Sequence, residues 1–421
     1  MKKLVSLYLL LIVVLTSFAG DSLKIMQYNL LYYDKITDWC TVWNNNVEDK
    51  NEYLKTITSF YKPDIFTVNE MNGSPASTDK LLNNALNTDG VGYYKRANYT
   101  GSYIVNMLYY NSEKLALKSQ SYILTSPRIT DVYQLYYKSD NLQNTDTVFI
   151  TCIVTHLKAG NGSDEREARK TASEKIMRYI QNYNIKGNIF LMGDLNVYYG
   201  SEPAFQSFLQ PTSSGVQLVD PINRVGYWHD NESYAAYHTQ STHTSGGCHS
   251  GGGMDDRFDF ILASKPIMEG SKGVTYVKDS YWAFGQDGNR LNESLINPTN
   301  TTLPTEVIDA LYNMSDHLPV VMSIYADTEL LSSPKPEVNS SQIVGFTNPV
   351  SNILTLDYRG DRNTNVEVSL VSQTGSIMLN KPTHMVPNST YHYNLQNFST
   401  GIYILKVAAK NFTFTDKIVK L

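Results

Sequence analysis

The sequence predicts an α/β domain followed by a small all-β sandwich domain. Over residues 21–326, short apolar runs alternate with stretches of helical periodicity, which is typical of an α/β domain. Over residues 342–421, apolar runs alternate with turn residues and no helical periodicity appears, which favours a β-sandwich. A chain of 421 residues, 42% of them apolar, suffices for two packed domains.

The first twenty residues have the features of a signal peptide. Lys2 and Lys3 precede an apolar run at 4–15, and residues 17–19 (SFA) have the small-x-small pattern of a cleavage site. This run is shorter than the roughly 20 residues that cross a bilayer. We therefore expect residues 1–20 to be removed and the protein to be exported, with an uncleaved anchor as the alternative. No later segment predicts a membrane span.

Strands and two helices are predicted in residues 21–326. The first helix covers 48–61 and ends before Pro63. The second covers 164–183, where Asp164 and Glu167 resemble a capping box. Seven strands, each bounded by Gly, Pro, Asn or Asp, are predicted at 23–31, 64–68, 103–110, 148–156, 188–192, 258–263 and 318–325.

Residues 327–341 are polar, contain two prolines and have no periodicity, so they are predicted to be a linker. About seven short strands are expected after it, among them 353–358, 366–371, 402–407 and 412–421.

Charge and cysteine content limit the function classes. The formal net charge is −5, and removal of Lys2 and Lys3 makes it −7. A polyanionic substrate must then be bound by a local basic patch or by bound cations. The three cysteines have neither a disulfide-framework spacing nor a metal-site spacing. Cys152 lies in an apolar strand and is predicted to be a buried thiol, while a bridge between Cys40 and Cys248 stays open.

Polar side chains fall at the ends of the apolar strands in the large domain. Strand ends share a rim in an open sheet, so we expect these side chains to surround one cleft. Carboxylate oxygens suit a hard divalent cation, and a histidine paired with a carboxylate suits proton transfer and charge stabilisation, as phosphoester hydrolysis requires. The set consists of Asn29, Glu70, His156, Asp194, Asn196, Asp259, Asp316 and His317.

Each of these residues also has a structural interpretation when it is taken alone. Asp194 could be a turn or cap aspartate, Asn29 a turn amide and His317 a structural histidine. Asp259 lies between two phenylalanines in an apolar strand, where an unpaired carboxylate would be costly to bury. The combination therefore favours chemistry more than any single member does.

Six segments in order resemble the endonuclease/exonuclease/phosphatase superfamily, which includes deoxyribonuclease I and bacterial sphingomyelinases. They are MQYNL (26–30), DIFTVNE (64–70), THLKAG (155–160), GDLN (193–196), RFDFILAS (257–264) and SDHLPV (315–320). The resemblance implies a four-layer α/β sandwich, with two central mixed sheets flanked by helices. It also implies hydrolysis of phosphoric esters with Mg²⁺, or alternatively with Ca²⁺ or Mn²⁺.

The resemblance assigns roles to individual residues. Glu70 corresponds to the principal metal ligand, with Asn29 and Asp316 as further ligands. The resemblance gives catalytic roles to the remaining residues. Asp194 and Asn196 position the water and a phosphate oxygen, and His317, oriented by Asp259, serves as base or transition-state stabiliser. His156 contacts a phosphoryl oxygen or aids the leaving group.

Two positions depart from the family pattern. Asn69 stands before the metal-binding glutamate, where the family usually has Gln. The deoxyribonuclease I branch also has an acid that pairs with its first histidine, and the strand at 103–110 (YIVNMLYY) holds none. The partner of His156 is therefore open.

The last eighty residues resemble the type A sorting domain of type IX secretion. The segments are TNPVSNILTL (347–356), VEVSLVSQTGSIML (366–379), LQNFSTGIYILKV (395–407) and KIVKL (417–421). The resemblance implies a bacterium of the Bacteroidetes type, the type IX machinery as a partner, and a cell-surface or extracellular location. A generic β-sandwich adhesion module is the alternative.

Residues 226–256 hold four histidines, His229, His238, His243 and His249, and several aromatic residues. They predict a long substrate loop, with metal binding by the histidines as the alternative. Its aromatic residues either stack on bases or pack: Tyr227, Trp228, Tyr234 and Tyr237. Arg166, Arg169 and Lys170 are predicted to form a solvated helix face.

Three functions compete. The first is an exported, monomeric nuclease acting on DNA or RNA. The second is a phosphodiesterase or phosphatase for lipid headgroups or inositol phosphates, for which an exposed hairpin at 281–284 (YWAF) is the candidate membrane contact. The third is a non-catalytic binder, which the clustered acids and histidines disfavour.

Overall fold

The computed structural model describes residues 21–139, 147–327, 344–360, 363–372, 376–409 and 413–421. The chain divides into two compact units, with the division between Ser332 and Ser333. The predicted signal peptide lies outside the described residues, as does all of the predicted linker except Asp327. Within the described part, no helix is both long enough and apolar enough to cross a membrane.

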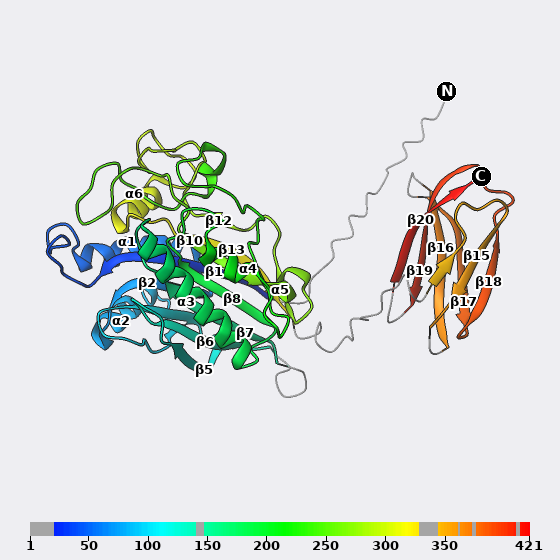
Figure 1. Cartoon of the computed structure of the whole chain (residues 1–421), viewed down its shortest axis with the longest axis horizontal. Coiled ribbons are helices and arrows are strands. Elements are labelled where there is room, and N and C mark those ends of the chain that lie inside the picture. Colours follow the sequence, from blue (N-terminus) through cyan, green and yellow to red (C-terminus); the bar gives the residue numbers. More distant parts are fainter. Residues whose placement is uncertain (1–20, 140–146, 328–343, 361–362, 373–375, 410–412) are drawn as a thin grey trace, which may run out of the picture. The chain divides into compact units, whose positions relative to one another are not determined.

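The large unit is built on two mixed β-sheets (Figure 1). In the first sheet the strand order is β11-β13-β1-β2-β4-β3, and β12 pairs with β13. Strands β1 and β2 are parallel and the other pairs are antiparallel. The bounds are β1 (Asp21–Tyr33), β2 (Ile65–Asn72), β3 (Tyr94–Arg96), β4 (Ile104–Asn111), β11 (Val274–Tyr276), β12 (Trp282–Ala283) and β13 (Val320–Ala326).

The second sheet has the order β5-β6-β7-β8-β10-β9. Its one parallel pair is β7 with β8. The bounds are β5 (Leu115–Ile123), β6 (Thr130–Tyr137), β7 (Phe149–His156), β8 (Asn188–Asp194), β9 (Leu218–Val219) and β10 (Asp259–Ser264).

Apolar side chains between the two sheets form the central core, where Ile25 and Ile65 of the first sheet share a cluster with Phe190 of the second. Helices cover the outer faces. Helices α1 (Val47–Tyr61) and α6 (Thr305–Met314) pack on the first sheet. Helices α3 (Ser163–Asn182) and α4 (Pro203–Leu209) pack on the second. This confirms the predicted four-layer arrangement.

The two predicted helices form, but only the first is capped by a side chain. In α1 the Asn46 side chain accepts hydrogen bonds from two backbone amides of the first turn, and the helix ends at Lys62 before Pro63. Helix α3 begins at Ser163 with Gly162 as its N-cap residue and no side-chain cap. The predicted capping box was wrong, because Asp164 lies within the first turn. There the negative charge of Asp164 instead interacts favourably with the positive end of the helix dipole.

Shorter elements complete the large unit. They are α2 (Pro75–Leu81), the π-helical turn η1 (Leu82–Leu86), the 3₁₀ turn η2 (Glu232–Tyr237) and α5 (Lys265–Glu269).

The C-terminal unit is all-β in its described residues, as predicted. One sheet has the order β14-β15-β18 and the other β17-β16-β19-β20. Leu356, Val368 and Leu405 belong to the apolar cluster that both sheets share. The bounds are β14 (Val344–Phe346), β15 (Ile353–Tyr358), β16 (Thr364–Ser372), β17 (Ile377–Met385), β18 (Ser389–Asn394), β19 (Gly401–Ala409) and β20 (Thr413–Lys420).

Candidate active site

A cleft of about 260 Å³ gathers the polar residues that the sequence singled out. Asn29 and Asp259 stand behind its wall and hydrogen-bond to residues that line it. The structure therefore brings all eight predicted site residues together, from both sheets of the large unit. The predicted residues that line the cleft are Glu70, His156, Asp194, Asn196, Asp316 and His317.

Backbone irregularities aim two of these side chains into the cleft. Glu70 has φ +57°, where the pairing of β2 with β4 shifts register between Val68 and Met71. Asn196 has φ +50° just after β8. A non-glycine residue in the left-handed backbone region costs about 1–3 kcal/mol, and such residues are concentrated at functional sites. The bulge therefore places Glu70 in the cleft at the expense of local stability.

His317 is held by a buried carboxylate. Its Nδ1 lies 2.6 Å from Asp259 Oδ2, and Asp259 pairs with Asp194 across strands β10 and β8. Burial alone would lower the pKa of His317, but the carboxylates of Asp259 and Asp194 raise it well above the usual value. This environment favours the imidazolium form, which suits stabilisation of negative charge on a phosphoryl oxygen.

Asp194 is held by three hydrogen bonds from its surroundings. Its Oδ2 accepts from Asn29 Nδ2 at 3.0 Å, its Oδ1 accepts from the Asn196 amide at 3.0 Å, and its own amide donates to Asn69 Oδ1. Burial raises its pKa to about 7; His317 opposes this shift and Asp259 adds to it. A carboxylate fixed in this way can orient a water and take its proton near neutral pH.

His156 has carboxylates on one ring nitrogen and no partner on the other. Its Nε2 lies 3.4 Å from Asp194 Oδ2 and 3.7 Å from Glu70 Oε1. Its buried Nδ1 has no hydrogen-bond partner among the described residues. Burial, with Arg128 and His317, holds its pKa well below the usual value. A neutral ring with its proton on Nε2 fits these contacts, since that nitrogen faces two acceptors.

Strand β4, which has no acid, carries the buried Asn106. Asn106 Oδ1 accepts from Asn69 Nδ2 at 2.7 Å, and its Nδ2 donates to Asp131 Oδ2 at 3.1 Å. These two contacts tie Asn106 into an amide network under the cleft. Strand β4 therefore supplies an amide and no acid, and His156 is not oriented by an acid from β4.

Glu70 and Asp316 have the character of cation ligands. Burial raises the pKa of Glu70, so its charged form needs positive charge nearby. Asp316 Oδ2 accepts from the Ser250 amide and from Gln240 Nε2, whereas its buried Oδ1 has no partner among the described residues. Oxygen ligands with unsatisfied capacity fit Mg²⁺ or another hard divalent ion.

Asn29 lies beside the carboxylates of the predicted site and is held by hydrogen bonds on both atoms of its amide. Its Oδ1 accepts from the Leu31 amide at 3.0 Å, and its Nδ2 faces Asp194 and Glu70. In this arrangement Asn29 donates to the carboxylates, and its oxygen keeps one lone pair beyond the bond from the Leu31 amide. Its role as a metal ligand stays a prediction.

The histidine-rich segment contains a group with metal-ligand geometry. His229, Asp255 and Asp256 present ligand atoms that all lie within 4.8 Å of one another. His229 Nδ1 is 2.8 Å from Asp256 Oδ1. None of the three lines the cleft.

The other three histidines and Trp228 do not belong to this group. His238 is buried and pairs with backbone oxygens of Trp228 and Met254. The rings of His243 and His249 stack on each other. The indole of Trp228 is fully buried against Phe205 and Phe260, so the stacking interpretation of Trp228 was wrong.

Two further expectations need correction. Arg169 is not on a solvated face: it is buried, pairs with Glu202, and donates to the backbone oxygens of Lys158 and Gly160. Its pairing with Glu202 reduces the free-energy cost of burying its charge. Its bonds to the backbone of Lys158 and Gly160 hold the loop that borders the cleft. The segment at 281–284 is not an exposed hairpin, because Tyr281 and Phe284 are buried in the core. This removes the membrane contact foreseen for a lipid substrate.

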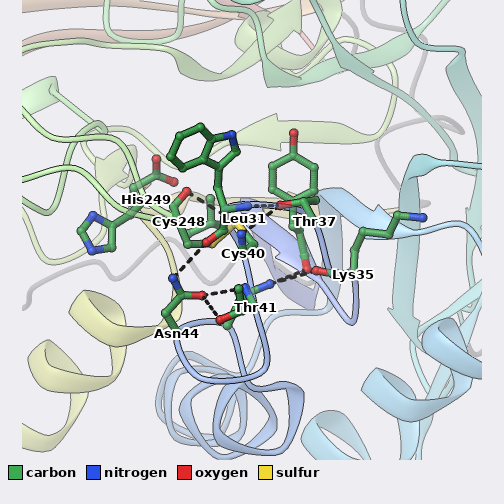
Figure 2. The surroundings of a disulfide bond; sticks show 12 residues. Leu31, Lys35, Thr37, Cys40, Thr41, Asn44, Cys248 and His249 are labelled. Carbon is green, nitrogen blue, oxygen red and sulfur yellow. Dashed lines mark hydrogen bonds between the residues drawn. A yellow bond between two sulfur atoms is a disulfide. The ribbon is translucent and has the colours of Figure 1, made fainter.

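Sequence reasoning missed several lining residues. Gln240 contacts His317 Nε2 at 2.8 Å as well as Asp316, and Tyr32 donates its backbone amide to Glu70 Oε2. Cys248 also lines the cleft and forms a disulfide with Cys40, while Cys152 is a free, buried thiol (Figure 2). No pattern in the sequence marks Gln240, because a single loop glutamine has no characteristic spacing.

Comparison with protein families decides the role of the C-terminal unit. Residues 346–421 match the secretion system C-terminal sorting domain. The sorting domain indicates that the protein is exported to the cell surface or the extracellular space, as predicted. No curated protein matches the sequence.

Several solved structures resemble the large unit. The catalytic domain of human Nocturnin is 14% identical, with 72% of this chain and 95% of that chain covered and a TM-score of 0.45. The endonuclease/exonuclease/phosphatase from Bacteroides vulgatus is also 14% identical, with 73% and 100% covered and a TM-score of 0.46. D. rerio TDP2, complexed with a single-strand DNA product, is 15% identical, with 72% and 98% covered and a TM-score of 0.44. Such TM-scores do not assign a function.

Proposed function

We propose that this exported protein is a divalent-metal-dependent phosphodiesterase that hydrolyses nucleic acid, DNA or RNA. The observation that carries the proposal is the convergence of Glu70, Asp194 and His317 in one cleft, although they lie in three distant parts of the chain. A structural role for each residue alone does not explain why three ionisable groups from distant parts of the chain share one cleft, since burying them together is costly.

The chain's own residues divide the chemistry among them. Asp194, held by Asn29 and by the Asn196 amide, orients the attacking water and accepts its proton. Held by Asp259, the His317 ring places its Nε2 toward the phosphoryl oxygens. His156 donates from Nε2 to the phosphoryl group or the leaving oxygen. A divalent ion held by Glu70 and Asp316 would neutralise charge on the phosphate.

The proposal predicts metal-dependent cleavage of nucleic acid and not of lipid. The purified protein is incubated with single-stranded DNA, RNA, plasmid DNA and sphingomyelin vesicles, with EDTA or with added Mg²⁺. We expect cleavage of nucleic acid that EDTA abolishes and Mg²⁺ restores. Cleavage of sphingomyelin while all nucleic acid survives would show that the site acts on lipid headgroups. The absence of any cleavage would support a non-catalytic binder.

A further inference from the structure

The loop between β1 and α1 exposes an unusual amount of apolar surface. Two of the four tryptophans lie in this loop and are exposed to solvent, while Trp228 is fully buried and Trp282 is partly buried. Such exposure is costly and marks an interaction site more often than chance placement. The exposed apolar residues of this loop, which we call the tryptophan loop (36–43), are Ile36 (54% exposed), Trp39 (77%), Val42 (53%) and Trp43 (92%).

The tryptophan loop is attached to the rim of the cleft at two points. Leu31 and Tyr32, which precede it, line the cleft. Cys40, at its centre, is bonded to Cys248, which also lines the cleft (Figure 2). Trp39 is therefore only one residue from a covalent link to the cleft wall, and a substrate that leaves the cleft on this side meets the loop.

Hydrogen bonds hold the loop in one shape. Thr37 Oγ1 accepts from the amides of Trp39 and Cys40 at 3.2 and 2.9 Å. Asn44 accepts from the Thr41 amide at 2.7 Å and donates to the Trp39 carbonyl at 2.9 Å (Figure 2). The backbone under the indoles is therefore ordered before any partner binds, which lowers the entropy cost of binding.

The polar groups around the loop favour nucleic acid over a bilayer. Asp38 is exposed between Ile36 and Trp39, and insertion of the loop into lipid would bury its carboxylate at high cost. Beside the loop, Lys35 Nζ lies 4.4 Å from the ring centroid of Tyr103, itself 54% exposed. Aromatic faces next to a cation are the combination that binds single strands, whose bases stack while the cation faces the phosphates.

We propose that Trp39 and Trp43 stack on unpaired bases of a single-stranded nucleic acid whose scissile phosphodiester lies in the cleft. This inference rests on the proposed function and narrows its substrate class. A duplex keeps its bases stacked on one another and offers them no faces, so the loop favours single strands or frayed ends over intact duplex.

The test compares the full-length protein with the Trp39→Ala/Trp43→Ala double variant. The substrates are a single-stranded oligothymidylate and an oligomer of the same length in which abasic sites replace most bases. The measured quantity is kcat/KM for the oligothymidylate divided by kcat/KM for the abasic oligomer. Since stacking contributes on the order of a tenfold or larger factor per base, this ratio should fall at least about tenfold in the variant. Tyr183→Ala is the control, because Tyr183 is likewise an exposed aromatic residue (69% exposed). It follows the C-terminal end of α3, the end farther from the cleft. This control variant should leave the ratio unchanged.

Tryptophan fluorescence gives a second readout that does not depend on turnover. In the presence of EDTA, oligothymidylate should quench the emission of the wild-type protein and leave that of the double variant unchanged. The inference would be overturned if the double variant had the same kcat/KM ratio as the wild-type protein. It would also be overturned if the double variant lost binding to sphingomyelin vesicles but still bound oligothymidylate. If the wild-type protein cleaves neither oligomer, it is the proposed function that fails. Cleavage with an unaltered ratio refutes only the stacking.

Discussion

Replacing His317 with glutamine should lower kcat on single-stranded DNA by about 10²–10⁴-fold, the usual contribution of an acid–base or charge-stabilising group. Glutamine can still donate to Asp259, whose carboxylate is fully buried and would otherwise lose its partner. The variant should therefore fold, and the loss should appear in kcat. Steady-state kinetics with Mg²⁺ present, together with a circular dichroism spectrum, checks both points.

His229→Gln is the matched control for this experiment. His229 also pairs through Nδ1 with an aspartate, Asp256, at 2.8 Å, but it lies outside the cleft. It should retain activity within about twofold, because the change is chemically the same without altering the cleft. A His317→Gln protein that is as active as the wild type would remove His317 from the mechanism. Equal losses in both variants would point to a general structural effect.

The second large effect concerns stability. Arg257 forms a bidentate pair with Asp220, with N–O distances of 2.9 and 2.8 Å, and both side chains are almost completely buried. Burial would raise the pKa of Asp220, but Arg257 holds it below the usual value. Arg257→Leu leaves that carboxylate buried without a cation. We expect a loss of about 3–5 kcal/mol in the free energy of unfolding.

Chemical denaturation followed by tryptophan emission measures this loss, because the indole of Trp228 is fully buried in the same unit and becomes exposed when the unit unfolds. Arg178→Leu on the exposed face of α3 is the control and should change the free energy by less than about 0.5 kcal/mol. A change below about 1 kcal/mol for Arg257→Leu would mean that Asp220 becomes protonated or hydrated at little cost. The pair would then not anchor the strand that carries Asp259.

The sequence predicted the parts of the fold that have strong apolar patterns. Strands β1, β2, β7, β8, β10 and β13 are apolar and have polar residues within, at or just before one end, so both their place and the grouping of the site residues could be foreseen. Strand β5 was missed because most of its residues are exposed and polar, and β6 because its tyrosines obscure the alternation. Neither strand supplies a residue that lines the cleft.

The finer features of the site depend on tertiary contacts that no local pattern records. The left-handed conformation of Glu70 follows from the bulge against β4. Gln240 and Ser250 reach Asp316 from a long loop, and the disulfide that anchors this loop joins residues 208 positions apart. Arg169 was expected in solvent because of its charge, and only its pairing with Glu202 explains its burial.

If Glu70 and Asp316 hold a divalent ion within the cleft, that ion can be located directly. Crystals of the protein soaked in Mn²⁺ and measured by anomalous diffraction locate such an ion directly. We predict an anomalous peak in the cleft, with carboxylate oxygens of Glu70 and Asp316 as ligands. A peak at His229, Asp255 and Asp256, with none beside Glu70, would contradict it.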